Sequence, residues 1–151
     1  MSLVRIGNAS GFYGDRLSAM REMLEAGELD YLTGDYLAEL TMLILGRDRM
    51  KDPSLGYAKT FIGQRQDCMG LAQSKGVRIV TNAGGLNPAG CAVKLREIAT
   101  EQGLDLSIAH VEGDDLLPRA DEFGFNDVAS GKVVTANAYL GAFGIAAALN
   151  A

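Results

Sequence analysis

Polar side chains suited to chemistry follow the short β-branched runs of this 151-residue chain. Asparagine recurs at three of these run ends, and its amide both donates and accepts hydrogen bonds, which suits recognition of a carbonyl, an amide or a hydroxylated carbon chain. Each asparagine could equally cap a helix or stabilise a turn. The residues at the five run ends are Asn8, Ser10 and Asp15, then Thr33 and Asp35, then Asn82, Gly84, Gly85 and Asn87, then Glu112, Asp114 and Asp115, and last Asn137 with Tyr139.

These residues have two predicted roles. The candidates for catalysis are Asp15, Asp35 and Asn82, in which an aspartate would move a proton. The candidates for substrate or anion binding are Asn8, Ser10, Gly11, Gly84, Gly85, Asn87 and Asn137. The Gly-rich turns at 11–14 and 84–87 could each aim backbone N–H groups at an anion, or could be simple turns.

No cofactor is identified by the sequence, because neither turn contains GxGxxG or the GK[ST] of a P-loop. No metal-ligand spacing is present, although Asp15 and Asp35 could share a cation. Cys68 and Cys91 lack a CxxC motif, and we interpret both as reduced thiols. Cys91 falls in the first turn of an expected helix, but no base accompanies it, which favours a structural thiol. His110 lies within an apolar run, which is typical of a core or half-buried histidine.

Short strands alternate with longer helical patterns along the chain. Strands are expected at 4–6, 29–32, 77–80, 106–111 and 133–136. Helices are expected from Asp15 to Gly27, from Asp35 to Gly46, over 54–73 in one piece or two, from Asn87 to Gly103, and from Asn137 to Leu149. The charged segment 47–53 and the stretch 119–132 are expected to be loops.

This alternation predicts a single α/β domain over residues 1–151, with a three-layer, Rossmann-like fold and a mostly parallel sheet of about five strands. Ligands bind such sheets beyond the carboxyl ends of the strands, where the strand order reverses. We therefore expect all five groups of polar residues at one edge of the sheet. This shared edge is the geometric premise of the predicted site.

Composition excludes several classes of protein. The chain has 14 Lys and Arg against 19 Asp and Glu, a formal net charge of −5 and a pI near 4.8. Nucleic acids and anionic membranes attract clustered positive charge, so neither is an expected partner. With 48% hydrophobic residues the chain can form a core without disulfides or metal. No run approaches 18 apolar residues and no signal-peptide pattern begins the chain, so we expect a cytoplasmic protein.

Four sequence strings are distinctive: VRIGNASGFYGD at 4–15, DYLTGDYLAELTM at 30–42, TNAGGLNP at 81–88 and TANAYLGAFG at 135–144. In them the chain resembles the acyclic terpene utilisation (AtuA-like) family. The resemblance implies a bacterial, cytoplasmic role in the catabolism of acyclic terpenes such as citronellol and geraniol, beside enzymes that carboxylate and hydrate acyl-CoA intermediates. It also implies that the chain corresponds to the amino-terminal part of longer family proteins. It assigns no catalytic residue.

Two functions are compatible with the sequence. The first is a catabolic enzyme, or the core of one, that acts on a small acyl or acyl-CoA substrate at the polar strand ends. The second is a noncatalytic binding or assembly module of a multi-subunit acyl-CoA-processing complex. The segments 36–45 and 139–149 are apolar on nearly every side, which favours a homo-oligomer or contact with the remainder of a longer chain.

Overall fold

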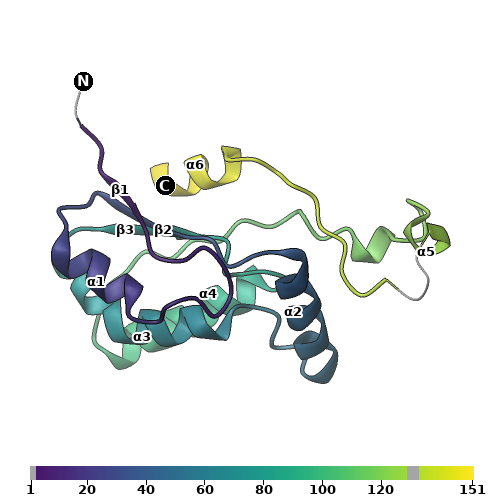
Figure 1. The fold of residues 1–151 in the computed structure, drawn as a ribbon, viewed down its shortest axis with the longest axis horizontal. Helices are drawn as coiled ribbons and strands as arrows, with labels where there is room; N and C mark the ends of the chain where they lie inside the picture. Colours follow the sequence, from purple (N-terminus) through teal and green to yellow (C-terminus); the bar gives the residue numbers. More distant parts are fainter. Residues whose placement is uncertain (1–2, 129–132) are drawn as a thin grey trace.

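A small parallel β-sheet forms the centre of the computed structural model, which describes residues 3–128 and 133–151 (Figure 1). The strands are β1 (Ile6–Asn8), β2 (Tyr31–Gly34) and β3 (Arg78–Thr81). They pair in the order β1-β2-β3, with Gly7, Leu32 and Ile79 side by side. All three strands therefore end at the same edge of the sheet, which confirms the expected parallel pairing.

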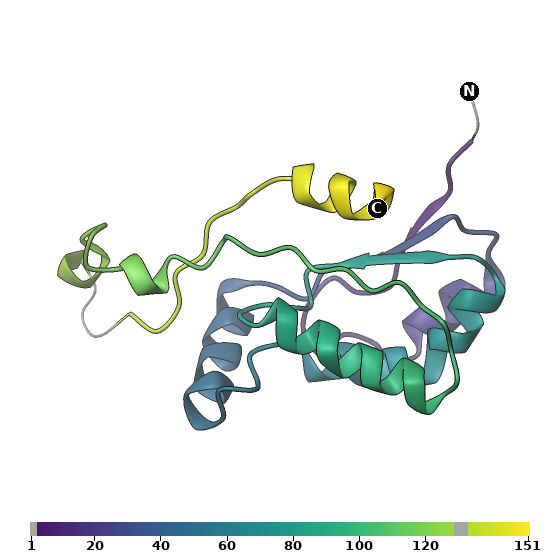
Figure 2. The same ribbon diagram turned by 180° about the vertical axis from the view of Figure 1, so that it is seen from behind.

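Helices cover one face of this sheet far better than the other. They are α1 (Ala19–Ala26), α2 (Glu39–Lys51), α3 (Lys59–Ser74), α4 (Pro88–Glu101), α5 (Phe125–Val128) and α6 (Phe143–Asn150), with the 3-10 turn η1 (Leu117–Arg119). Front and back views show α1, α3 and α4 together on one face and α6 alone over the other (Figures 1 and 2). Because α6 buries none of its residues, the third layer of the predicted fold is one loosely packed helix.

The core lies between the sheet and the layer of α1, α3 and α4. Leu24 of α1, Leu32 of β2 and Met69 of α3 are fully buried. Tyr36 joins them, with its ring edge-on to Phe61 at a centroid distance of 5.4 Å. Each such side chain contributes roughly 1.5–3 kcal/mol to folding. This core holds the carboxyl ends of the strands in place.

The boundaries of α4 follow the sequence signals closely. Asn87 precedes Pro88, and its side chain accepts a hydrogen bond from the Gly90 N–H at 2.9 Å, as expected for an N-cap before a first-turn proline. Gly103 follows the helix with a φ of +66°. Glycine adopts this left-handed conformation at the lowest cost, so it ends helices readily.

The sheet has three strands among the described residues, and the prediction of about five was wrong. Residues 106–111 run beside β3 (Figures 1 and 2) without forming a ladder with it. Leu106 and Ile108 pack against the core, but the Ile108 carbonyl accepts a hydrogen bond from the Arg96 side chain. Residues 133–136 form no strand either, and the chain makes a single antiparallel bridge between Asp115 and Asn137.

Several expected helix starts are wrong because polar residues expected as caps bind other groups. Helix α1 begins at Ala19 and not at Asp15, while α2 begins at Glu39, after an N-cap at Ala38, and not at Asp35. Helix α6 begins at Phe143 and not after Asn137. The single helix α3 begins at Lys59, later than expected. Each strand also begins one or two residues late, which places Asn8 and Thr33 inside strands.

Helix α2 differs most from its prediction. It continues through Gly46 to Lys51, so most of the charged segment expected as a loop is helical. Gly46 is buried, and a Cβ there would lie 2.9 Å from the Thr135 methyl carbon, so glycine permits this close approach. Leu45 is fully buried, but Leu40 is 69% exposed. Across residues 3–128 and 133–151, helices are too short or too polar to span a bilayer.

Residues 112–128 and 133–138 project from the body as an arm that carries η1 and α5 (Figures 1 and 2). Two backbone hydrogen bonds close its base: the Leu116 N–H donates to Ala136 at 2.7 Å and the Ala138 N–H donates to Asp114 at 2.8 Å. The stretch expected to be irregular is therefore partly helical. Residues 129–132 of that stretch lie outside the described residues.

Candidate functional site at the carboxyl edge of the sheet

Four exposed or half-exposed polar side chains meet where β1, β2 and β3 end. Asn8 and Thr33 are register partners, and the Thr33 hydroxyl lies 3.0 Å from the Asn8 side-chain oxygen. Asp35 and Asn82 follow β2 and β3, and Asn82 Nδ2 donates to Asp35 Oδ1 at 2.7 Å. The premise of a shared edge therefore holds for the first three groups of predicted residues. The strand order does not reverse there, because β1, β2 and β3 are neighbours in chain order.

The Asp35–Asn82 pair is held on both sides by backbone groups. Asn82 Oδ1 accepts the Tyr36 N–H at 2.8 Å, and Asp35 Oδ1 accepts the Leu37 N–H at 3.0 Å. Asp35 Oδ2 receives no hydrogen bond from the described residues, and the residue is exposed. The arrangement orients a carboxylate and leaves one of its oxygens open to solvent.

Two amide donors also remain at this edge. A side-chain amide carries two N–H hydrogens. Asn8 Nδ2 donates only to the Ser10 carbonyl, at 3.0 Å, and Asn82 Nδ2 donates only to Asp35 within the described part of the chain. One hydrogen on each amide is thus left to a ligand. Together with Asp35 Oδ2, the edge offers two donors and one acceptor.

Asp15 lies in the segment between β1 and α1, but its oxygens are used locally. Oδ2 accepts the Gly11 N–H at 2.9 Å and Oδ1 accepts the Arg16 N–H at 2.7 Å. These two hydrogen bonds hold the pKa of the Asp15 carboxyl below its ordinary value of 3.8. Ser10 is buried, and its carbonyl accepts the Asp35 N–H at 2.9 Å. Asp15 and Ser10 therefore support the conformation of this edge through hydrogen bonds with backbone groups.

The Gly-rich turn after β3 is closed by its own hydrogen bonds. The Gly85 N–H donates to the Asn82 carbonyl at 3.1 Å. Gly85 has a φ of +53°, and a Cβ there would meet the Leu45 side chain and lie 2.8 Å from the Gly56 carbonyl oxygen. Glycine is needed at this position for conformation and for space. The Gly85 amide expected to bind an anion is engaged within the turn.

Asn87 has every side-chain group engaged. Its oxygen accepts the Gly90 N–H, and its nitrogen donates to the carbonyls of Ser54 and Leu55 at 2.9 and 3.2 Å. Its own N–H donates to the Gly84 carbonyl at 2.9 Å. Asn87 thus caps α4 and ties the helix start to the segment before α3.

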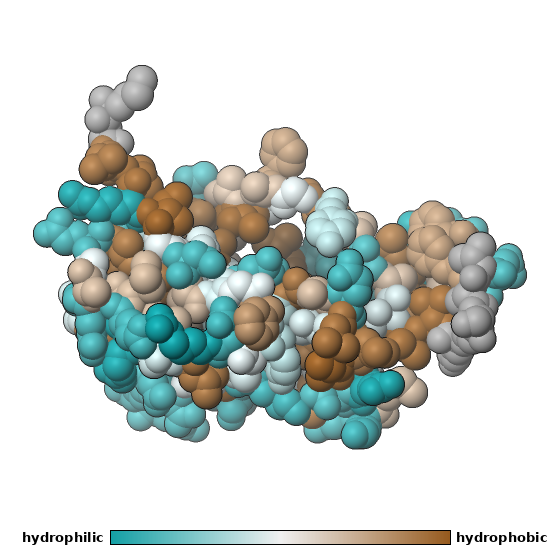
Figure 3. All heavy atoms as spheres, viewed as in Figure 1, coloured by the Kyte–Doolittle hydropathy of each residue, from teal (hydrophilic) through white to brown (hydrophobic). Residues whose placement is uncertain are grey.

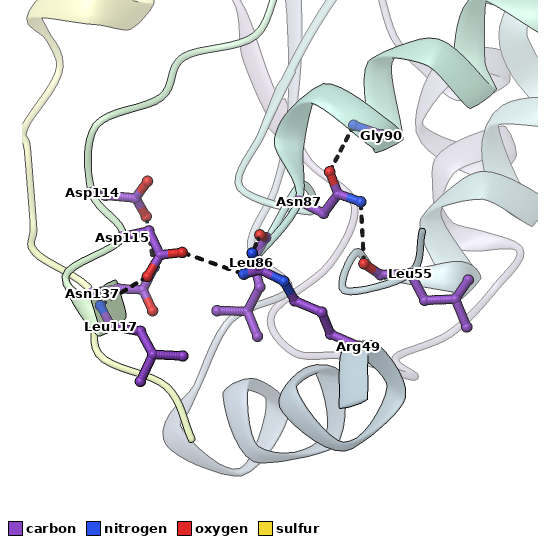
Figure 4. A network of polar contacts seen from close by, with 9 residues as sticks. All are labelled: Arg49, Leu55, Leu86, Asn87, Gly90, Asp114, Asp115, Leu117 and Asn137. Atoms are coloured by element: carbon purple, nitrogen blue, oxygen red, sulfur yellow. Dashed lines mark hydrogen bonds and ion pairs between the residues drawn. The ribbon is translucent and has the colours of Figure 1, made fainter. Parts of the chain in front are cut away.

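Asn137, Asp114 and Asp115 do not lie with the polar groups at the strand ends. They contact the Gly-rich turn through Arg49 (Figure 4). Arg49 of α2 donates to the Leu86 carbonyl at 3.1 Å and lies 3.3 Å from Asp115 Oδ2. Asn137 Nδ2 donates to Asp114 Oδ2 at 3.0 Å. This network fastens the arm to the body. Arg49 was missed in the sequence because it falls in a segment expected to be a loop.

The thiols and the histidine lie outside the polar groups that meet at the strand ends. Both cysteines are free and buried. Burial raises the pKa of the Cys91 thiol to about 11, which outweighs any effect of its position in the first turn of α4. His110 is exposed, with 33% of its side chain accessible, so the expected core or half-buried position was wrong, and its Nε2 lies 3.7 Å from the Glu112 carboxylate. Within the described ranges, no three His, Cys, Asp or Glu residues are placed to hold a metal ion.

A buried polar group behind the edge was also missed. Tyr36, Gln64 and Arg65 are all buried, and the Tyr36 hydroxyl donates to the Gln64 side chain at 2.5 Å. The signal was present in the sequence, because Arg65 lies four residues after Phe61 and three before Cys68, on the apolar stripe of α3.

Two surface hollows lie away from this edge. One, of about 470 Å³, lies on α4 and is lined by Val93, Arg96, Glu97, Thr100 and Glu101. The other, of about 280 Å³, is lined by Arg5, Gly27, Glu28, Leu29, Lys75 and Val77, near the starts of the strands. Neither contains a predicted site residue. The candidate site is an edge at which Asn8, Asp35 and Asn82 are exposed.

The fold and this edge define a parallel α/β protein with a candidate ligand site at its strand ends. Residues 4–151 match the family model described as "Acyclic terpene utilisation family protein AtuA". The chain belongs to this family, as its four strings predicted, and the membership supports a role in acyclic terpene utilisation. No curated protein and no solved structure matches the chain.

Proposed function

We propose that the chain binds a small acyl or acyl-CoA substrate of acyclic terpene utilisation at the carboxyl edge of β1, β2 and β3 and takes part in its conversion. The observation that carries the proposal is the Asp35–Asn82 pair, 2.7 Å apart on an exposed edge, with Asp35 Oδ2 unengaged among the described residues. A carboxylate positioned in this way can accept a proton from a bound substrate.

Each residue of the edge has a distinct part in this proposal. Asp35 accepts the proton at Oδ2. Asn82 is a positioning residue, because its amide holds Asp35 Oδ1 and the Tyr36 N–H together. The remaining N–H hydrogens of Asn8 and Asn82 would donate to a substrate carbonyl, which becomes more negative as a neighbouring carbon loses a proton.

The other predicted site residues support this edge. Asp15 and Gly11 fix the segment after β1, and Ser10 holds Asp35 through its backbone. Gly84, Gly85 and Asn87 shape the turn after β3, while Asn137 joins the arm to the body. These residues remain candidates for contact with a larger ligand such as coenzyme A.

The test is binding, because it needs no knowledge of the reaction. Terpenoid acids related to citronellol and geraniol, their CoA thioesters and free CoA are titrated into the protein by calorimetry. We expect at least one of these compounds to bind, and Asp35→Asn and Asn82→Ala to weaken it tenfold or more. Glu39→Gln, one turn away at the exposed start of α2, is the matched control and should bind normally. Unchanged affinity in both edge variants would remove the basis of the proposal.

A second candidate is a noncatalytic assembly module, which is favoured by apolar side chains left in solvent. Phe143 of α6 is 90% exposed and Ile6 of β1 is 65% exposed. Figure 3 shows apolar residues gathered at the start of the chain, where Leu3 and Val4 are also exposed. In this case Phe143→Glu would dissociate an oligomer seen by sedimentation. A wild-type chain that sediments as a monomer at all concentrations contradicts this candidate.

A further inference from the structure

Arg65 is a buried cation that has no ion-pair partner among the described residues. It lies on the buried side of α3 and is 8% exposed. Its Nη1 atom is fully buried and makes no hydrogen bond. None of the ion pairs among the described residues includes it. Buried guanidinium groups are normally paired with a carboxylate or fully hydrogen-bonded, because an unpaired buried charge is strongly destabilising.

The ionisable groups that act on Arg65 do not neutralise it. They are Tyr36 and Cys68. Burial raises the pKa of Tyr36 to about 12, and it also raises the pKa of the Cys68 thiol above its ordinary value of 9.0. Both groups are therefore neutral at pH 7. Burial lowers the pKa of Arg65 to about 10, so its guanidinium still carries a full positive charge at that pH.

The surroundings of Arg65 are polar and adjoin the candidate edge. Tyr36 follows Asp35 directly and donates to Gln64, the neighbour of Arg65 in the chain. Gln64 Nε2 donates in turn to the Leu17 carbonyl at 3.2 Å. Ser10 is also buried, and it lies close enough to Tyr36 to lower the pKa of the phenol slightly. The charge is thus part of a polar layer behind the ends of β1 and β2.

We propose that Arg65 is the recognition residue of an oxyanion-binding site that takes a carboxylate or phosphate group. The planar guanidinium can donate two parallel N–H bonds to either group, which also supplies the missing negative charge. This site exists whether or not Asp35 carries out chemistry, so it goes beyond the proposed function.

The experiment compares the melting temperatures of the full chain in sodium phosphate, sodium 3-methylbutanoate and sodium chloride at one ionic strength. Phosphate or carboxylate should raise the melting temperature by about 5–10 °C at a hundredfold excess over Kd, and chloride should not. Arg65→Met should abolish the rise. Arg47→Met should keep it, because Arg47 is exposed on α2 and belongs to none of the described ion pairs. The anion that raises the melting temperature identifies the class of ligand.

The stability of Arg65→Met and the oxyanion binding of Arg65→Lys provide two further tests. Without oxyanion, Arg65→Met should melt no lower than wild type, because it removes an unpaired buried charge and keeps an apolar chain of similar length. Arg65→Lys keeps the charge but loses the planar guanidinium, and it should weaken oxyanion binding at least tenfold. This variant tests the proposal if Arg65→Met does not fold. Equal stabilisation of wild type by chloride, or a full oxyanion response in either Arg65 variant, would overturn the proposal.

Discussion

At the scale of single residues, hydrogen bonds distinguish the asparagines that lie near the strand ends. Asn8 and Asn82 keep one amide hydrogen unengaged by the described residues, whereas Asn87 uses both hydrogens and its oxygen. All three follow or end a β-branched run, and only Asn87 precedes a proline, which predicts its role as a helix cap but not the use of its amide hydrogens. The separation depends on carbonyls at Ser54 and Leu55 that only the folded chain brings to Asn87.

This distinction predicts opposite effects for two alanine variants. Asn87→Ala removes an N-cap and two tethers, so we expect it to lower the free energy of unfolding by about 1–3 kcal/mol. Asn82→Ala, at an exposed position, should lower it less and weaken ligand binding more. Urea unfolding monitored by circular dichroism measures the first effect and calorimetry measures the second. A larger loss of stability in Asn82→Ala would contradict this assignment of roles.

The buried thiol of Cys91 predicts a pH dependence of stability. Its pKa rises from 9.0 to about 11 on folding, so the folded chain holds the thiol proton more tightly than the unfolded chain. The stabilisation that comes from the protonated thiol is complete below pH 9. It is lost as the pH rises to about 11, which lowers the free energy of unfolding by roughly 2–3 kcal/mol. Urea unfolding at pH 8 and pH 11 should show this loss in wild type and a smaller loss in Cys91→Ala. Parallel losses in the two proteins would count against a buried, protonated Cys91.

At the scale of elements, two glycine substitutions test how the Gly-rich turn is built. Gly85→Ala should destabilise the protein by about 2–4 kcal/mol, because a Cβ at φ +53° would meet the Leu45 side chain and the Gly56 carbonyl. Gly63→Ala is the matched control, since Gly63 lies at an exposed position of α3 and a Cβ there would have no neighbour within 4 Å outside the helix's own backbone. It should be neutral or stabilise by up to about 1 kcal/mol. Thermal and urea unfolding give both values.

The elements whose boundaries depend on residues close in sequence were predicted correctly or nearly so. The start of α4 was correct because Asn87 and Pro88 act within one turn, and the three strands were found within two residues. The expected strands at 106–111 and 133–136 failed for a nonlocal reason. Alternating side chains such as Leu106 and Ile108 specify which face is buried, but a ladder needs a partner strand, and the Ile108 carbonyl is bound by Arg96.

The candidate site could be predicted where it depends on the parallel strands, but not where it depends on contacts that form only in the folded chain. Parallel strands end at one edge, so Asn8, Asp35 and Asn82 could be placed together from the sequence, and the structure joins Asp35 to Asn82. The position of Asn137 could not be predicted, because it depends on an arm closed by a bridge to Asp115. The role of Asp15 was also hidden, because it binds backbone N–H groups that appear only when the segment folds.

At the scale of the whole molecule, stability is concentrated on one side of the sheet. The residues of the main core cluster belong to β2, α1, α3, α4 and the segments next to them, while α6 buries none of its own. Hydrogen exchange followed by mass spectrometry should therefore show slow exchange in α3 and α4 and fast exchange in α6. Protection in α6 equal to that in α3 would show that the second face of the sheet is firmly covered in solution.

We propose above that a ligand of acyclic terpene utilisation binds where β1, β2 and β3 end. Amide chemical-shift mapping by nuclear magnetic resonance, which suits a 16.0 kDa chain, tests this binding directly during titration with a terpenoid acid or its CoA thioester. We expect the largest shifts at residues 8–11, 33–37 and 81–85, and we expect them to disappear in Asp35→Asn. Shifts centred on the α4 hollow around Val93 and Glu97, with the strand ends unchanged, would contradict the proposal.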